Sequence, residues 1–367
     1  MSLIFKHQNV SFSLSVSAIE NKDLQQKIEI ALKDVFKGFI SCSAECIAFE
    51  FIFTDNIKSF IVDKEFIRVK DVKVGKNQTH FKDTELDFLI NNSNKFKVYI
   101  NISDNETLKS SLRIFNKAFK NNIELQISTF YYRIFLLFTQ IWNVENNCSY
   151  VHASAVEVNG KSILFTADSG VGKSSLLFKL SQDSNFKFIA DDLTIISDQS
   201  ESYYQGRCLS VKPYHLNYYN FLADRLDLLM SRMQKLQWKY LKDNRLTYRI
   251  SPNDLFASVS EKSKIKSIIH LCNHDKDIFE IKNITTEELI NFMIPILTNE
   301  LFLANHKLNT LSSLPFSPFQ STAKIYAASE DIFNSAFKNL SLKLVFIPYM
   351  SNPNDLYNFL NNEGCLN

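Results

Sequence analysis

Glycine and proline are scarce in this sequence, with seven of each in 367 residues. The chain also has no CxxC pair, because its six cysteines are dispersed along its length. They are Cys42, Cys46, Cys148, Cys208, Cys272 and Cys365. This spacing indicates neither a zinc site nor a disulfide framework, so we expect free thiols in a cytoplasmic protein.

Strong net charge and long apolar runs are missing as well. The formal net charge is +2 and the basic residues are scattered, which favours neither nucleic acid nor an anionic membrane as a partner. The most apolar stretch, residues 130–142, is too short to span a bilayer and contains Arg133. Residues 1–10 contain Lys6, His7 and Gln8 where a signal peptide needs an apolar core. We therefore expect a cytoplasmic protein.

The composition that remains is typical of a globular protein, with 45% hydrophobic and 22% charged residues. A chain of 367 residues exceeds what one hydrophobic core usually serves, so we expect two domains. Strand-like patterns and one helical pattern, at residues 23–36, predict a β-rich N-terminal domain of unknown role over residues 1–105. The predicted strands are residues 11–17, 48–53, 60–62, 66–74 and 96–102.

The second predicted domain, residues 106–367, has an α/β pattern. Apolar residues at helical spacing predict helices over residues 108–119 and 130–141. The turn dipeptide Asn159-Gly160 between residues 151–158 and 162–165 predicts a β-hairpin. Further strands are expected at residues 186–190, 193–196, 265–271 and 342–347, and further helices at 218–241 and 286–297.

A phosphate-loop motif follows the hairpin. Residues 167–174 read A-D-S-G-V-G-K-S and fit GxxxxGK[ST] except at Ala167, where glycine is usual. Glycines let backbone amides turn inward around phosphate oxygens, and the following helix offers its positive end. Lys173 would contact the β- and γ-phosphates of ATP, and the Ser174 hydroxyl would coordinate Mg²⁺. The predicted nucleotide-binding residues are Asp168, Ser169, Gly170, Val171, Gly172, Lys173, Ser174 and Ser175.

The alternative interpretation of the tripeptide Gly-Lys-Ser is a purely structural turn that caps a helix. Strand, loop and helix in the right order make the phosphate loop the better interpretation. An acidic pair downstream, Asp191 and Asp192, ends the predicted strand 186–190. In a parallel sheet the carboxyl ends of strands meet at one edge, so we expect this pair beside the loop.

One carboxylate of the pair would face Mg²⁺ and the other would accept a proton from the attacking hydroxyl. The sequence does not assign these two roles between Asp191 and Asp192. The alternative for the pair is a solvated turn at the end of a strand.

These residues resemble the HPr kinase/phosphorylase family. The order of His152, T-A-D-S-G-V-G-K-S at residues 166–174 and I-A-D-D at residues 189–192 is that of the family's catalytic core, over about residues 151–196. The resemblance implies a P-loop kinase of the HPr kinase and phosphoenolpyruvate carboxykinase-like type that uses ATP and Mg²⁺. It implies Lys173, Asp191 and Asp192 as catalytic residues and His152 as a neighbour of the transferred phosphoryl group. Related kinases often form oligomers, so a homo-oligomer is one option.

Two departures from the family shape the functional hypotheses. The family's glycine-rich segment for recognition of HPr and for the reverse phosphorylase reaction is replaced by residues 206–216, and residues 1–105 have no counterpart. We therefore expect a kinase that acts on a hydroxyl of a sugar-type metabolite or of a serine in a peptide or protein other than HPr. The alternatives are an ATP-binding regulatory or assembly module and, with less support, a phosphoenolpyruvate-linked decarboxylase.

Overall fold

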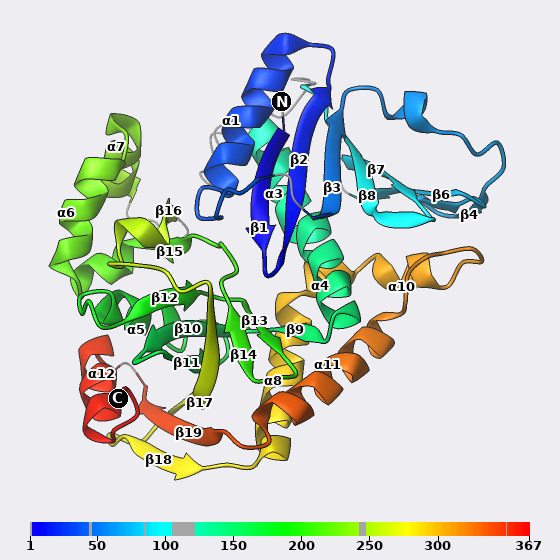
Figure 1. Ribbon diagram of the computed structural model, residues 1–367. Coiled ribbons are helices and arrows are strands. Elements are labelled where there is room, and N and C mark those ends of the chain that lie inside the picture. Colours follow the sequence, from blue (N-terminus) through cyan, green and yellow to red (C-terminus); the bar gives the residue numbers. More distant parts are fainter. Residues whose placement is uncertain (1, 44–45, 84–85, 105–121, 242–246, 350) are drawn as a thin grey trace. The chain divides into compact units, whose positions relative to one another are not determined.

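The computed structural model describes residues 2–43, 46–83, 86–104, 122–241, 247–349 and 351–367 (Figure 1). The chain forms a mixed α/β protein with two compact units. The first comprises residues 1–147 and 298–330, and the second comprises residues 148–297 and 331–367. The division therefore differs from the boundary expected after residue 105, because residues up to 147 and a returning segment belong to the first unit.

The first unit is built on an eight-stranded sheet with the order β1-β2-β3-β8-β7-β6-β5-β4. Strands β2, β3 and β8 run parallel, and the other pairs are antiparallel. Along β3, Phe49, Phe51 and Phe53 alternate with less buried residues and are themselves fully buried, so they share one face. The strands are β1 Ser2–His7, β2 Val10–Ala18, β3 Ile47–Thr54, β4 Ile67–Val69, β5 Val72–Val74, β6 Gln78–Asp83, β7 Leu86–Asn91 and β8 Asn94–Asn101.

Helices α1 (Lys22–Val35), α3 (Asn122–Phe130) and α4 (Leu136–Glu145) pack with this sheet, and a π-helical turn η2 (Tyr131–Phe135) joins the last two. The Asn21 side chain caps α1 by accepting hydrogen bonds from two backbone amides. The ring of Phe51 lies 5.2 Å from that of Phe130 and 6.2 Å from that of Phe138. The apolar faces of α3 and α4 thus complete the core of the N-terminal sheet, which explains why residues 122–147 belong to the first unit.

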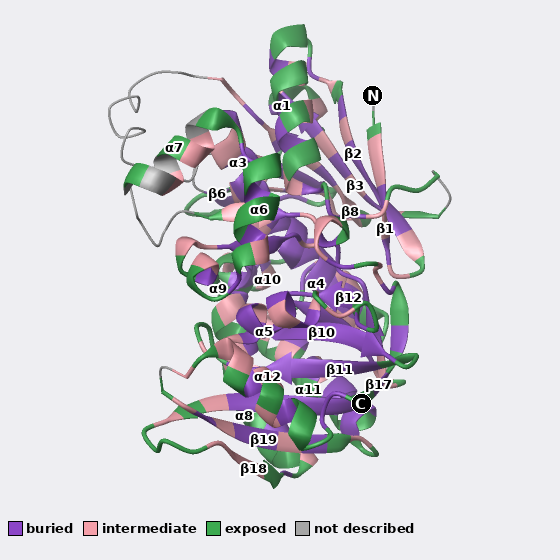
Figure 2. Ribbon diagram, turned by 90° about the vertical axis from the view of Figure 1, so that its left-hand side faces the viewer, coloured by how far each residue is buried: buried purple, intermediate pink, exposed green. Residues whose placement is uncertain are grey.

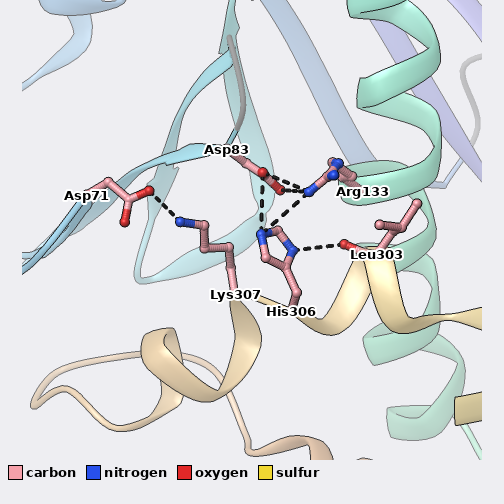
Figure 3. A network of polar contacts seen from close by, with 6 residues as sticks. All are labelled: Asp71, Asp83, Arg133, Leu303, His306 and Lys307. Atoms are coloured by element: carbon pink, nitrogen blue, oxygen red, sulfur yellow. Dashed lines mark hydrogen bonds and ion pairs between the residues drawn. The ribbon is translucent and has the colours of Figure 1, made fainter. Parts of the chain in front are cut away.

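The returning segment of the first unit carries α9 (Phe302–Asn305) and α10 (Leu308–Ser312) and is tied to the sheet by charged groups (Figure 3). Asp83 at the end of β6 accepts a hydrogen bond from Arg133 Nη1 at 2.9 Å and lies 3.4 Å from His306 Nε2. Lys307 forms an ion pair with Asp71. Because Asp83 is buried, its ion pair with the Arg133 guanidinium offsets part of the desolvation of its carboxylate.

Several predictions for the first unit are confirmed, while others are wrong. The helix at 23–36 and the strands at 11–17, 48–53 and 96–102 are present. Residues 60–62 are not a strand: η1 (Ile57–Phe60) is a 3-10 helix, and the amide of Val62 bonds to the Gln78 side chain. Residues 66–74 form two short strands, and β1, β6 and β7 were not expected. The helix predicted at residues 108–119 lies outside the described residues.

His7 at the end of β1 is buried with its Nε2 2.9 Å from Asn143 Oδ1, and burial lowers its pKa to about 4. Below pH 6.5 the unfolded chain binds a proton that folded His7 excludes, so the folded state loses stability as the pH falls from about 6.5 toward 4. We expect that His7→Gln removes a pH-dependent change in the free energy of unfolding on the order of 3 kcal/mol. Urea unfolding of both proteins at pH 7 and pH 4.5 measures this change. The partly exposed His274→Gln is the control. Identical pH profiles for His7→Gln and the unaltered protein would refute this account.

The second unit contains a nine-stranded mixed sheet with the order β12-β10-β11-β17-β14-β13-β9, and β19 pairs with both β17 and β18. A separate two-stranded sheet pairs β15 with β16. In Figure 2, β10 and β11 are buried along most of their length. The strands are β9 Cys148–Val151, β10 Ala153–Val158, β11 Lys161–Thr166, β12 Lys187–Ala190, β13 Thr194–Ser197, β14 Glu201–Tyr203, β15 Leu209–Val211, β16 Tyr248–Ile250, β17 Lys262–His274, β18 Glu280–Asn283 and β19 Ser341–Pro348.

The strand directions bring three carboxyl ends to one edge of this sheet. Strand β10 runs antiparallel to both β11 and β12, so β11 and β12 point the same way although they are not neighbours. Strand β17 runs parallel to β11. Expected strands at 162–165, 186–190, 193–196, 265–271 and 342–347 are confirmed, as is the Asn159-Gly160 turn, where both residues have positive φ.

The helices of the second unit largely match the sequence pattern. The predicted helix 286–297 is α8, and the predicted helix 218–241 is two helices, because the chain is extended at Met230. Among the described residues, none of the helices has the length and apolar character needed to cross a bilayer. The helical segments are α5 Lys173–Leu180, η3 Pro213–Asn217, α6 Asn220–Leu229, α7 Arg232–Leu241, η4 Pro252–Asp254, α8 Thr286–Glu300, α11 Thr322–Phe337 and α12 Pro353–Asn362; α8 and α11 each continue into the first unit.

Candidate functional site

The 167–172 loop connects β11 to α5 at the edge where the carboxyl ends of the strands meet. Gly170 and Gly172 have φ of 89° and 118°, a region that L-residues rarely adopt. An added Cβ would meet nothing within 4 Å at either position, so glycine is required by the backbone conformation rather than by lack of space. Ala167 is buried and is not among the residues with positive φ, which explains why alanine is tolerated there.

Lys173, the first residue of α5, turns its ammonium group back into this loop. Its Nζ donates hydrogen bonds to the carbonyl oxygens of Ala167 at 2.9 Å and Asp168 at 3.0 Å. His152 Nε2 lies 2.9 Å from the same Nζ. The lysine is only 5% exposed, so its ammonium group is held by protein oxygen and nitrogen atoms and not by water.

His152 lies at the bend between β9 and β10, not within the long strand predicted over residues 151–158. Burial, followed by the nearby charge of Lys173, lowers the pKa of His152 to about 4. A neutral imidazole can accept a hydrogen bond at Nε2 from the lysine ammonium. This histidine therefore acts in the structure as an acceptor that orients Lys173.

Asp191 follows β12 and reaches the start of α5. Ser174 Oγ donates to this carboxylate, at 3.1 Å from Oδ1 and 3.2 Å from Oδ2. Ser154 Oγ on β10 donates to Oδ1 at 2.7 Å. The folded chain thus joins two residues 17 positions apart, as the shared strand direction of β11 and β12 leads one to expect.

Asp192 adopts a left-handed conformation with φ of 63°, which turns the chain directly after Asp191. Aspartate tolerates this conformation better than most residues, and such strain is concentrated at functional sites. Its Oδ2 lies 3.1 Å from Arg207 Nη2. The two neighbouring carboxylates therefore have different partners: hydroxyl groups surround Asp191, and a guanidinium group pairs with Asp192.

These surroundings separate the pKa values of the two carboxyl groups. Burial and then the charge of Asp192 raise the pKa of Asp191 to about 6. Burial also acts to raise the pKa of Asp192, but the positive charges of Arg207, Lys173 and Lys212 outweigh it and hold that pKa below its ordinary value. Asp192 is thus the more readily ionised member of the pair.

The segment from residue 212 to 219 is fastened to α5. Tyr219 Oη donates to the Ser175 carbonyl oxygen at 2.7 Å, and the His215 ring packs 4.8 Å from that of Phe178. This segment carries Tyr214, whose pKa is raised by burial and by the charges of Asp191 and Asp192. Tyr214 is therefore within electrostatic reach of the acidic pair.

The predicted site residues fall into two groups. Two pairs are hydrogen-bonded, Lys173 with His152 and Ser174 with Asp191, and Asp192 follows Asp191 in the chain. The rest of the predicted set belongs to the loop or to α5, where Ser175 is buried and supplies only its carbonyl oxygen to Tyr219. The loop residues Asp168, Ser169 and Gly170 are exposed, and Val171 and Gly172 are half-buried.

Three site residues were not found from the sequence. Ser154 and Arg207 contact the acidic pair, and His270 Nδ1 on β17 lies 2.9 Å from Thr166 Oγ1 at the base of the loop. The sequence marked Arg207 only as part of residues 206–216, which replace the glycine-rich segment of the HPr kinase/phosphorylase family. A signal that could have found it is Gly206 before it, one of seven glycines in the chain, which has φ of 84°.

The donor set at this edge limits what it could bind. Within the described ranges, no group of three or more His, Cys, Asp or Glu side chains is arranged to hold a metal ion. Asp191 and Ser174 offer oxygen ligands, and the loop offers amides near a buried ammonium group. Oxygen donors suit a hard cation that completes its shell with water or ligand phosphates.

Comparison with known proteins gives little beyond this geometry. No protein-family model and no curated protein matches the chain. Among solved structures, the chain is similar to the Hpr(Ser) kinase/phosphatase from Coxiella burnetii, with a TM-score of 0.28 and 10% sequence identity. The match covers 59% of this chain and 96% of that chain. This is a distant likeness of fold, and at this TM-score nothing about the activity of the present chain follows from it.

Proposed function

We propose that this chain is a kinase that transfers the γ-phosphoryl group of ATP to a hydroxyl group. The observation that supports this most is the contact of Ser174 Oγ with the Asp191 carboxylate at 3.1 and 3.2 Å. A structural helix-capping turn has no need of a buried carboxylate at this hydroxyl. A site for a metal-bound triphosphate needs both, because Mg²⁺ is held by a hydroxyl, a carboxylate and phosphate oxygens.

Each part of the loop has a role in binding the nucleotide. The amides of residues 169–173 and the amino end of α5 cradle the phosphates. Lys173 exchanges its contacts with the Ala167 and Asp168 carbonyl oxygens for the β- and γ-phosphate oxygens, with His152 holding the far side of the ammonium. Ser174 and Asp191 would hold Mg²⁺, which would neutralise charge on the phosphates.

Asp192 is the general base of the proposed reaction. Its pKa lies below the ordinary value, so it is ionised at neutral pH and can accept a proton. The acceptor oxygen forms a bond to the γ-phosphorus as the bond from that phosphorus to the β–γ bridging oxygen breaks. The proton of the acceptor hydroxyl passes to the Asp192 carboxylate, and ADP leaves. Asp191, which accepts hydrogen bonds from Ser174, is assigned to the metal ion.

The acceptor is a sugar-type metabolite or a serine of a peptide or protein. The test is to incubate the purified chain with cell extract and Mg²⁺, using ATP labelled at the γ-phosphate in one sample and at the α-phosphate in another. The proposal predicts label in an acid-stable product from the γ-labelled sample alone, because a phosphate ester of a hydroxyl survives acid. Absence of any transferred label removes support for a kinase.

A second candidate function is a nucleotide-binding module in which ATP occupancy gates assembly or signalling. The ion pair of Asp192 with Arg207 favours it, because a base already paired at 3.1 Å has to be released before it can accept a proton. Population shift by a nucleotide needs only differential binding to two states. The Asp192 variant described in the Discussion separates the two functions.

A further inference from the structure

Arg207 is held rigidly beside the acidic pair. Its guanidinium Nη2 lies 3.1 Å from Asp192 Oδ2, and its side chain is only 13% exposed. The backbone is fixed as well: the Arg207 amide donates to the Gln205 side chain at 3.1 Å, and Gln205 is buried. Directly after it, Cys208 is buried and β15 pairs with β16. The charge therefore does not depend on a loose surface loop for its position.

A surface ion pair would not explain this arrangement. Exposed pairs such as Lys27 with Asp23, at 45% and 74% exposure, contribute little to stability, and their side chains are free to separate. In the Arg207 pair both partners are largely removed from solvent, and placing a guanidinium there is costly unless it serves the carboxylate or something that binds next to it.

Two of the cations that act on the acidic pair, Lys173 and Arg207, are anchored in different places. Lys173 is anchored in the loop by the Ala167 and Asp168 carbonyl oxygens, where the nucleotide phosphates are proposed to bind. Arg207 is anchored at Asp192, the proposed base, where the acceptor hydroxyl has to lie within hydrogen-bond reach. A phosphoryl group moving from the first place to the second spreads negative charge over its equatorial oxygens.

We propose that Arg207 is a further catalytic residue: its guanidinium contacts the equatorial oxygens of the transferring phosphoryl group from the acceptor side. This inference rests on the proposed kinase function. In the resting protein Arg207 pairs with Asp192, and it exchanges this partner for the phosphoryl group when nucleotide and acceptor are bound. Arg207 neither gains nor loses a proton in this step. The bonds formed and broken, and the transfer of the hydroxyl proton to Asp192, are therefore the same as in the proposed kinase reaction. A planar guanidinium suits such oxygens better than an ammonium group.

The test measures binding of Mg-ADP with and without aluminium fluoride, which mimics the transferring phosphoryl group and needs no knowledge of the acceptor. Calorimetry compares the unaltered chain with Arg207→Gln and Arg207→Lys. We expect aluminium fluoride to raise the affinity of the unaltered chain for Mg-ADP. In Arg207→Gln this increase in affinity is expected to be about 100-fold smaller, because one contact to the transition-state mimic is lost. The affinity for Mg-ADP alone stays within about threefold. Arg207→Lys recovers part of the gain.

The exposed Arg225 on α6 provides the matched control, Arg225→Gln, and thermal unfolding shows whether each variant folds. If Arg207→Gln keeps the full gain from aluminium fluoride, or if the unaltered chain shows no gain, Arg207 is not a catalytic residue. If the unaltered chain binds no Mg-nucleotide at all, the proposed function itself is overturned.

Discussion

Replacing Asp192 with asparagine is expected to lower the rate of phosphoryl transfer by about 10³-fold, within the range of general-base contributions. Asparagine keeps the size of the side chain and the left-handed backbone conformation, in which it is tolerated. It removes the carboxylate that accepts the proton. The rate is measured with γ-labelled ATP, and Mg-ATP affinity by calorimetry. Affinity is expected to change by less than about tenfold, because Asp191 and Ser174 remain.

Asp191→Asn is the informative partner of this variant. Because Asp191 is assigned to the metal, its loss is expected to weaken Mg-ATP binding as well as transfer. Asp224→Asn, at an exposed position on α6, is the control. Nucleotide binding and biological activity that both persist in Asp192→Asn would favour the gating module over the kinase. Loss of Mg-ATP binding in Asp192→Asn but not in Asp191→Asn would reverse the two assignments.

Replacing Lys173 with methionine is expected to lower kcat/KM for transfer by about 10³-fold, because one buried cation on the phosphates is lost. Methionine retains most of the length of the side chain, so the change is mainly one of charge. The carbonyl oxygens of Ala167 and Asp168 and the His152 ring then lose the donor they share. Initial rates with labelled ATP check the expectation.

The control for this variant is Lys179→Met on the same helix, where the ammonium lies 5.4 Å from the Tyr357 ring centroid. Thermal unfolding has to accompany both, since loss of a donor to buried carbonyl groups costs about 1 to 3 kcal/mol of stability. Folded Lys173→Met protein that transfers phosphate at the unaltered rate would contradict a phosphate-binding role for the 167–172 loop.

Local patterns were sufficient to predict much of the fold. Alternating apolar residues identified β2, β3 and β8, and helical spacing identified α1 and α8. Periodicity did not reveal that α3 and α4 cover the N-terminal sheet, because their apolar faces carry no mark of the partner on which they pack. Residues 298–330 join the first unit through long-range pairs such as Lys307 with Asp71, which sequence spacing does not encode.

The candidate site was predicted where its residues share a motif. The sequence placed Lys173 and Ser174 after a strand and a glycine-bearing turn, and the structure has them there. It expected Asp191 near the loop on the basis of a parallel sheet, whereas antiparallel β10 lies between β11 and β12. Ser154 and Arg207 were missed because only folding brings them to the acidic pair. Ser154 is 37 positions from Asp191, to which it donates a hydrogen bond. Arg207 is 15 positions from Asp192, with which it forms an ion pair.

Calorimetric titration of the unaltered chain with ATP, once with Mg²⁺ and once with excess EDTA, tests most directly whether this edge of the second unit binds a metal-bound triphosphate. We expect saturable binding that depends on Mg²⁺, because Ser174 and Asp191 offer oxygen ligands beside the buried Lys173. No binding in either titration, or equal affinity in both, would contradict a kinase site built from the 167–172 loop and the acidic pair.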